Sequence, residues 1–103
     1  MMLKDIQKQA YENKVNRNFN VTDVGKEIIL MTEELGELAK AYKKSDKKPA
    51  KEISNKAEIV DAVGDLMVYC LGLCEMLDVN SEDVLKEIID NNTKRVHSGY
   101  MPK

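Results

Sequence analysis

Residues 59–77 read IVDAVGDLMVYCLGLCEML, and this stretch decides the fold. It is too long for a single strand, and its apolar residues would lie on nearly every side of a helix. Its charged residues are Asp61, Asp65 and Glu75. Because three acids make a poor membrane span, we expect a buried helix of a protein that has no membrane partner.

Helix signals also dominate on both sides of this segment, and no stretch reads clearly as a strand. The sequence therefore predicts an all-α fold class, a four-helix bundle-like single domain over residues 1–103. Apolar spacing and helix-start signals place its helices over residues 2–14, from Thr22 or Asp23 to about Lys44, from about Ala50 to Leu77, and from Ser81 to about Val96.

The apolar core available to one chain is small. The sequence has 103 residues with no Trp and one Phe, so aliphatic and Met side chains must fill the interior. A central helix that is apolar nearly all round needs more cover than its short neighbours offer. We therefore expect a homo-oligomer, either a dimer or a tetramer, and a compact monomer is the alternative.

The net charge and the cysteine content indicate which binding partners and which cellular compartment to expect. The net charge is −2, which argues against nucleic acid as a partner because such binding needs a basic field. The first residues hold no long apolar stretch of the signal-peptide kind. The two cysteines, Cys70 and Cys74, fit the reduced thiols of the cytosol, and we expect a cytoplasmic protein.

The positions of the acids are the informative feature for function. Glu34 and Glu37 are three residues apart on one face of the second helix. Glu58, Asp61 and Asp65 follow an i, i+3, i+7 spacing on the third, so they share a stripe of an apolar helix. Buried carboxylates need compensation, and hard oxygen ligands on two facing helices suit Mg²⁺, with Mn²⁺ possible.

The alternative is an acidic surface paired with Lys26, Lys40 or Lys43. No Lys or Arg occurs between Lys56 and Lys86, so the third helix offers no basic partner of its own. Pairing with lysines is therefore the weaker explanation for Glu58, Asp61 and Asp65, which we call the acidic stripe. For Glu27, Glu33 and Glu52, in contrast, pairing with nearby surface lysines is the expected role.

These residues resemble a known family. Residues 33–38 (EELGEL), 58–61 (EIVD) and 64–69 (GDLMVY) resemble the MazG-like, all-alpha nucleoside triphosphate pyrophosphohydrolases, whose signature is ExxE followed by ExxD. The resemblance extends from about residue 20 to 95. It implies Mg²⁺-dependent hydrolysis of a nucleoside triphosphate substrate to monophosphate and pyrophosphate. It also implies that Glu34 and Glu37 are catalytic, and that Glu34, Glu37, Glu58, Asp61 and Asp65 hold metal.

The sequence departs from this family in the second acidic pair. In many relatives that pair ends at the Asp of a Gly/Ala-Asp-Leu/Val stretch, which aligns with Asp65 here. The Glu expected three residues earlier is then Ala62. Either Glu58 and Asp61 form the working pair, or Asp61 and Asp65 have replaced them.

Groups that bind the polyphosphate are expected near the end of the fourth helix. Asn92, Lys94 and Arg95 resemble the Asn-x-x-Lys/Arg segment of the family, which implies contacts with substrate. The alternative is a helix C-terminus whose cations suit the helix dipole. Other functions stay open: a nucleotide- or metal-binding oligomer with weak catalysis, an interaction bundle, or dUTPase-like specificity.

Overall fold

The computed structural model describes residues 1–97. Its elements are α1 (Leu3–Asn16), α2 (Val24–Lys43), a 3₁₀ turn η1 (Ala50–Glu52), α3 (Lys56–Met76) and α4 (Ser81–His97). These residues contain no strand, so the predicted all-helical fold with four α-helices is confirmed. None of the described helices is long and apolar enough to cross a membrane.

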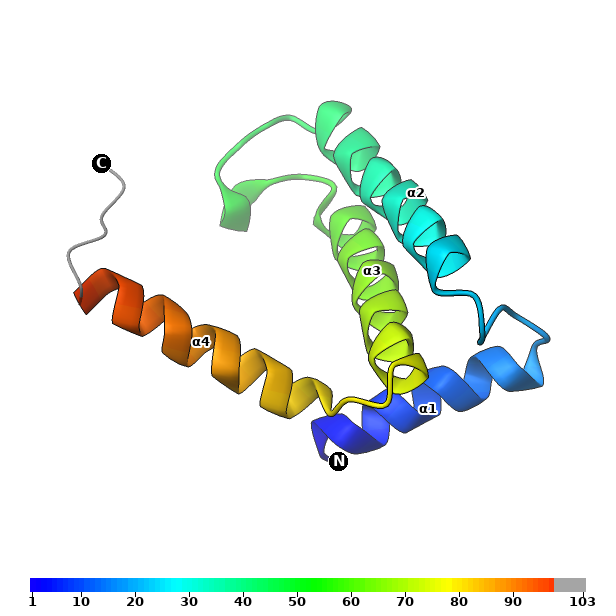
Figure 1. Ribbon diagram of the computed structural model, residues 1–103. Coiled ribbons are helices and arrows are strands. Elements are labelled where there is room, and N and C mark those ends of the chain that lie inside the picture. The colour runs from blue at the N-terminus through cyan, green and yellow to red at the C-terminus, as the bar shows by residue number, and fades with distance from the viewer. Residues whose placement is uncertain (98–103) are drawn as a thin grey trace.

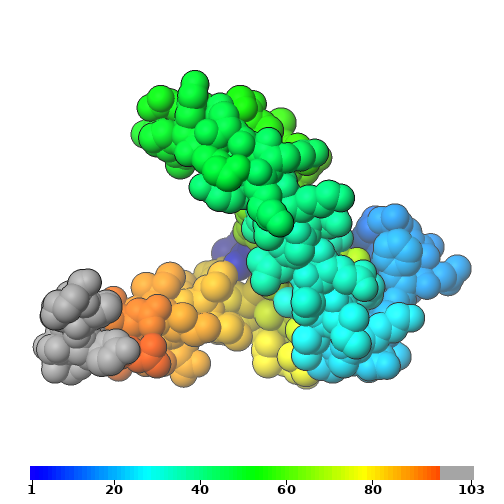
Figure 2. All heavy atoms as spheres, turned by 90° about the horizontal axis from the view of Figure 1, so that it is seen from above, coloured from blue at the N-terminus to red at the C-terminus, as the bar shows by residue number. Residues whose placement is uncertain are grey.

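The helices form an open arrangement. α2 and α3 run antiparallel side by side, and α1 crosses the end of α3 (Figure 1). α4 packs against α1 near the start of both helices and then extends away from α2 and α3 (Figure 1). Figure 2 shows the same spread from above, with the end of α4 well separated from α2. The Cα radius of gyration is 16.4 Å, whereas a compact domain of this length has about 13 Å.

Side-chain caps fix where two helices begin. The Asp23 carboxylate accepts a hydrogen bond from the Lys26 backbone N–H at 3.1 Å, so Asp23 rather than Thr22 caps α2. At α4 the cap is Asn80, whose side-chain oxygen accepts from the backbone N–H of Glu82 at 2.9 Å. Ser81 is therefore the first helical residue. Its backbone N–H donates to the buried Gln7 side chain at 2.8 Å, which ties α4 to α1.

The third helix begins later than the sequence predicts. α3 starts at Lys56, and only the short turn η1 forms near Ala50. The backbone of Ile53 is extended, which separates the two elements. The Asn55 amide then donates to the Ala41 carbonyl oxygen at 2.9 Å and ties the start of α3 to the end of α2.

Very little apolar surface is buried within the part of the chain that the structure describes. Its buried apolar residues are three alanines, Ala10, Ala41 and Ala62. The expectation of a buried third helix is wrong for a single chain, because only Ala62 and Gly72 of α3 are buried. The reason is geometric: α1 and α2 cover only part of α3, and α4 turns away from it. Large apolar side chains are left exposed on α2, α3 and α4, among them Ile29, Val60, Met67, Leu85, Ile88 and Ile89.

An ion pair occupies the interior instead. Glu27 has no exposed surface, and its carboxylate pairs with the buried Lys14 ammonium of α1. The Asn20 amide donates to the other oxygen of Glu27 at 3.1 Å. The Lys14 stem passes so close to Gly72 of α3 that a Cβ there would lie 3.0 Å from it. The expectation that Glu27 is a surface acid is therefore wrong: it anchors α2 to α1.

We expect Lys14→Met to destabilise the fold severely. Removing one partner of a buried pair leaves the other charge uncompensated, which costs about 3–5 kcal/mol in the free energy of unfolding. The double variant Lys14→Met/Glu27→Leu should recover part of that loss, because no charge is then buried. Urea denaturation measures both. Lys8→Met is the matched control, an exposed α1 lysine whose replacement should cost less than about 0.5 kcal/mol. Equal effects of the Lys14 and Lys8 variants would contradict the assignment.

Candidate functional site

Five carboxylates line one hollow between α2 and α3, which we call the acidic pocket. α2 contributes Glu34 and Glu37, and α3 contributes Glu58, Asp61 and Asp65. Ala41 and Ala62 complete its lining, and its volume is about 170 Å³. The structure thus brings together all five acids that the sequence predicts as metal ligands.

The acidic pocket is open to solvent in the single chain. Glu37, Glu58, Asp61 and Asp65 are exposed, and Glu34 is half-buried. The expectation of a buried acidic stripe on the third helix is therefore wrong here, for the same reason that α3 itself is uncovered. Because these carboxylates are largely exposed, the cost of burial does not argue for a cation in the acidic pocket. The mutual repulsion of their like charges does.

Glu34 combines partial burial with the repulsion of neighbouring acids. Its pKa is raised, first by loss of hydration and then by the negative charges of Asp65, Glu37 and Glu33. The nearby charge of Glu34 contributes in turn to the raised pKa of the Tyr69 hydroxyl, whose first cause is burial. Among the charges that raise the pKa of Glu34, that of Asp65 from the facing helix is the first.

Glu58 has a different environment. Its carboxylate lies 2.7 Å from the Lys44 ammonium, at the end of α2. The hydrogen bond from Lys44 is the first cause of the lowered pKa of Glu58. A basic partner for one acid of the stripe thus comes from the end of the neighbouring helix, as the alternative of an acidic surface paired with lysines allows.

The donor set of the pocket suits a hard divalent cation. Its ligands would be carboxylate oxygens, which Mg²⁺ and Mn²⁺ prefer. Among residues 1–95, whose side chains the structure describes, no three acidic, histidine or cysteine side chains converge closely enough to hold a metal ion as they stand. Like charges favour such separated side-chain positions. Binding would therefore require Glu34, Glu37, Asp61 and Asp65 to rotate toward a common centre.

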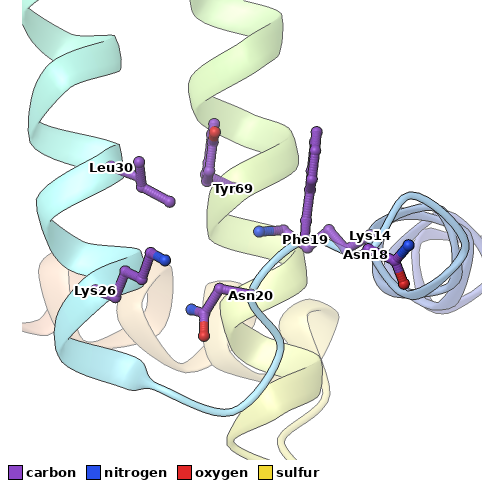
Figure 3. Close-up of a pocket in the computed structure, with 7 residues that line it drawn as sticks. All are labelled: Lys14, Asn18, Phe19, Asn20, Lys26, Leu30 and Tyr69. Atoms are coloured by element: carbon purple, nitrogen blue, oxygen red, sulfur yellow. The ribbon is translucent and has the colours of Figure 1, made fainter.

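Two further hollows continue from the acidic pocket toward α1. The middle hollow, of about 350 Å³, shares Glu34 and Asp65 with the acidic pocket and has Arg17 and Asn13 on its α1 side. The loop hollow, of about 280 Å³, lies under the α1–α2 connection (Figure 3). Its lining residues are Lys14, Asn18, Phe19, Asn20, Lys26, Leu30 and Tyr69.

Sequence reasoning assigned Tyr69 no role in this lining. A signal for it exists, because Tyr69 follows Asp65 by one helical turn and therefore shares its face. Arg17 lies just beyond α1, in the Asn-rich connection of residues 16–20. It reaches the hollow only because of the angle between α1 and α3.

The predicted substrate contacts of α4 are not brought to this site within one chain. Asn92, Lys94 and Arg95 are exposed and belong to the part of α4 that extends away from α2 and α3 (Figure 1). The Arg95 guanidinium donates to the Asn92 side-chain oxygen at 3.2 Å. Their contact with substrate stays a prediction.

The chain thus combines an all-helical fold with carboxylates from two antiparallel helices in one pocket. A family model described as phosphoribosyl-ATP pyrophosphohydrolase matches residues 3–92, and the chain belongs to this family. The match includes all five carboxylates and Asn92, and it ends before Lys94 and Arg95. Membership of the related MazG-like group stays a prediction. No match was found among curated proteins.

We expect Glu34→Gln to change how the stability of the metal-free protein depends on pH. A carboxylate whose pKa is raised on folding destabilises the folded state once it ionises, so its cost appears as pH rises through the raised pKa. The free energy of unfolding should therefore fall more steeply with pH in the wild type than in the variant. Urea denaturation between pH 4 and pH 8 in a chelating buffer measures this.

The matched control is Glu87→Gln, an exposed acid of α4. Its pH profile should follow that of the wild type. Addition of Mg²⁺ at pH 7.5 should raise the melting temperature of the wild type more than that of Glu34→Gln. Identical pH slopes for the wild type and Glu34→Gln would refute the electrostatic account of the pocket.

Proposed function

We propose that the chain catalyses Mg²⁺-dependent hydrolysis between the α and β phosphates of a nucleoside triphosphate or of a nucleotide derived from one. The products are the monophosphate and pyrophosphate. The observation that carries the proposal is that five acidic residues from α2 and α3 line one pocket. The family match supports phosphoribosyl-ATP as the first substrate to test, because it contains that same triphosphate.

Glu34, Glu37, Asp61 and Asp65 would hold the cation. When bound, Mg²⁺ neutralises charge on the phosphate oxygens and makes the phosphorus more electrophilic. Glu58 lies at the edge of the pocket, where Lys44 already compensates it. Its part is to close that edge rather than to hold metal on its own.

Glu34 would serve as the general base where the cation leaves its carboxylate free. In that role it would take a proton from the attacking water as the water oxygen bonds to phosphorus. The bridging phosphorus–oxygen bond then breaks, and pyrophosphate leaves. Glu37, one turn away, is the alternative base.

We also propose that the working unit is a homo-oligomer, a dimer or a tetramer. Exposed apolar side chains lie along α2, α3 and α4, including Ile29, Met67 and Ile88. A lone chain with so little buried apolar surface is poorly stabilised, and a second copy would cover these faces. The same packing is the route by which the end of α4 could approach an acidic pocket.

We expect Asp65→Asn to reduce pyrophosphate release by at least about 100-fold, because it removes a charge that neutralises the cation and couples to Glu34. The assay presents phosphoribosyl-ATP and a panel of ordinary, deoxy and damaged triphosphates with Mg²⁺, and it includes dUTP and dCTP. Asp61→Asn should have a comparable effect.

Glu33→Gln is the matched control, an exposed acid beside Glu34 that lines none of the three hollows. It should keep turnover within about threefold of the wild type. Nucleotide binding without pyrophosphate release in the wild type would favour a nucleotide-binding oligomer. Full activity in the Asp65 variant would refute the site.

We expect the protein to sediment as a multiple of its 11.7 kDa chain mass. Replacing Ile88 with Glu, on the exposed apolar side of α4, should shift the distribution toward the single chain, because a charge at an apolar interface is costly. Sedimentation equilibrium measures both masses. Lys86→Glu, on the same helix, is the polar control, and it should leave the mass unchanged. A wild type that sediments as one chain would refute the proposal.

A further inference from the structure

Lysines gather at the end of α2 and in its connection to α3. Residues 40–56 hold seven of the sixteen basic residues of the chain but only two of its eighteen acids. The chain as a whole has a net charge of −2, so this segment is a local exception. It begins at the end of α2 that points away from α1 (Figure 1). The site described above involves only one of these lysines, Lys44, as the partner of Glu58.

Three of these lysines line one hollow on the surface of α2, which we call the lysine hollow. Lys40, Lys43 and Lys44 form its sides, Gly36 and Ala39 complete its lining, and its volume is about 630 Å³. Side chains on a helix lean toward its N-terminus, so Lys40 leans toward Gly36 and Lys43 toward Ala39. Apart from its own helix backbone and chain neighbours, a Cβ at Gly36 would meet no atom within 4 Å. The space beside the lysine stems is therefore open to a ligand.

Two of the three ammonium groups in the lysine hollow have no partner in the part of the chain whose side chains the structure describes. Neither Lys40 nor Lys43 has an ion pair or a side-chain hydrogen bond within residues 1–95. Lys44 pairs with Glu58, which leaves other donors of its ammonium available. Like charges held within about one turn of a helix repel one another. An anion that contacts all three would remove that repulsion.

A different lysine fills the usual role of a cation at a helix C-terminus. The Lys47 ammonium donates to the backbone carbonyl oxygens of Lys43 and Ser45 at 2.6 and 3.4 Å, which covers the negative end of α2. Asp46, an acid of the same segment, is also engaged, because its carboxylate accepts from the Lys48 backbone N–H at 3.2 Å. The lysines of the hollow are therefore needed neither to complete the helix nor to pair with Asp46.

A condensed phosphate suits the lysine hollow best. Ammonium groups are compact point charges that bind phosphate oxygens well. The three lysines span four residues of helix, or about 6 Å, so together they can contact two linked phosphate groups. A single nucleic-acid strand would stack its bases on aromatic side chains, and the lining has none. A membrane-surface helix inserts large apolar side chains, which Gly36 and Ala39 do not supply.

The lysine hollow adjoins the acidic pocket. Lys44 lines the hollow, Glu58 lines the pocket, and 2.7 Å separates the ammonium of one from the carboxylate of the other. The reaction proposed above releases pyrophosphate from the pocket. Pyrophosphate that leaves across this edge would meet the three lysines.

We propose that the lysine hollow is a separate binding site for condensed phosphates, with pyrophosphate as its ligand. Lys40, Lys43 and Lys44 contact the phosphate oxygens, and Lys44 is shared between the anion and Glu58. The anionic class of the ligand follows from the lysines alone, whereas the choice of pyrophosphate rests on the proposed function. Binding here needs no metal ion, because the lysines themselves supply the positive charge.

The test measures pyrophosphate binding to the full chain by calorimetry, in a chelating buffer of near-physiological ionic strength. Without a cation the acidic pocket repels anions, so binding reports the lysine hollow. Lys43→Gln should weaken pyrophosphate binding by about fivefold, and Lys40→Gln/Lys43→Gln by at least about tenfold, because charged contacts are lost. Orthophosphate should bind about tenfold more weakly than pyrophosphate, since it reaches fewer ammonium groups.

Lys51→Gln is the matched control, an exposed lysine of η1 in the same lysine-rich segment but outside the hollow. It should leave pyrophosphate binding within about twofold of the wild type, because screening weakens distant charges. Equal weakening by the Lys51 and Lys43 variants would indicate a diffuse basic surface and overturn the site. No pyrophosphate binding by the wild type would do the same. If Lys43→Gln lost binding of a single-stranded oligonucleotide or of phosphatidylserine vesicles but kept that of pyrophosphate, the ligand would be a macromolecule and the proposal wrong.

Chemical labelling supplies a second readout that locates the bound anion. Acetylation of surface lysines, followed by mass spectrometry, should be slowed by pyrophosphate at Lys40 and Lys43 but not at Lys8 or Lys51. Uniform protection, or none, would contradict the proposal. Metal-free pyrophosphate binding at these lysines with no pyrophosphate release from any triphosphate would uphold this site and refute the enzymatic function. Pyrophosphate release without metal-free binding would do the reverse.

Discussion

The buried pair of Lys14 and Glu27 is the interaction on which the arrangement of this chain depends. It joins α1 to α2, while the Lys14 stem lies against Gly72 and its ammonium against Tyr69 of α3. Three helices thus meet at one ammonium group, with Asn20 fixing the connection between two of them. An ion pair is a costly way to fill an interior, since hydrophobic side chains of similar volume often stabilise as much or more. What it provides is a defined geometry for α1.

That geometry positions both parts of the site. Ala41 and Ala62, buried between α2 and α3, let the two helices approach closely enough for their carboxylates to share a pocket. The angle of α1 then brings Arg17 and Phe19 to the same side of α3 as Asp65. The small core and the dense charges are linked, because a thicker apolar layer between α2 and α3 would separate the acids.

The sequence predicted what depends on local spacing. Apolar periodicity and caps located the four helices, and the i, i+3, i+7 pattern placed Glu58, Asp61 and Asp65 on one face. Prediction from the sequence failed where burial and pairing depend on contacts between residues far apart in the chain. Lys14 and Glu27 are thirteen residues apart on different helices, so nothing local marks them as a buried pair. The apolar composition of α3 indicated burial, but the direction of α4 decides how much cover one chain supplies.

The environment of the acids also bears on which of them act together. The sequence alone allowed either Glu58 with Asp61 or Asp61 with Asp65. Glu58 has a basic partner in Lys44, whose hydrogen bond lowers its pKa. Asp65 has no such partner among the described residues and instead raises the pKa of Glu34 across the pocket. A divalent cation is stabilised most by carboxylates that have no other partner and that face one another across the pocket. We therefore infer that Asp61 and Asp65 provide the α3 side of the site. The departure at Ala62 then has a physical reading: Asp65 keeps its place, and Asp61, one residue before Ala62, would supply the second carboxylate of the pair.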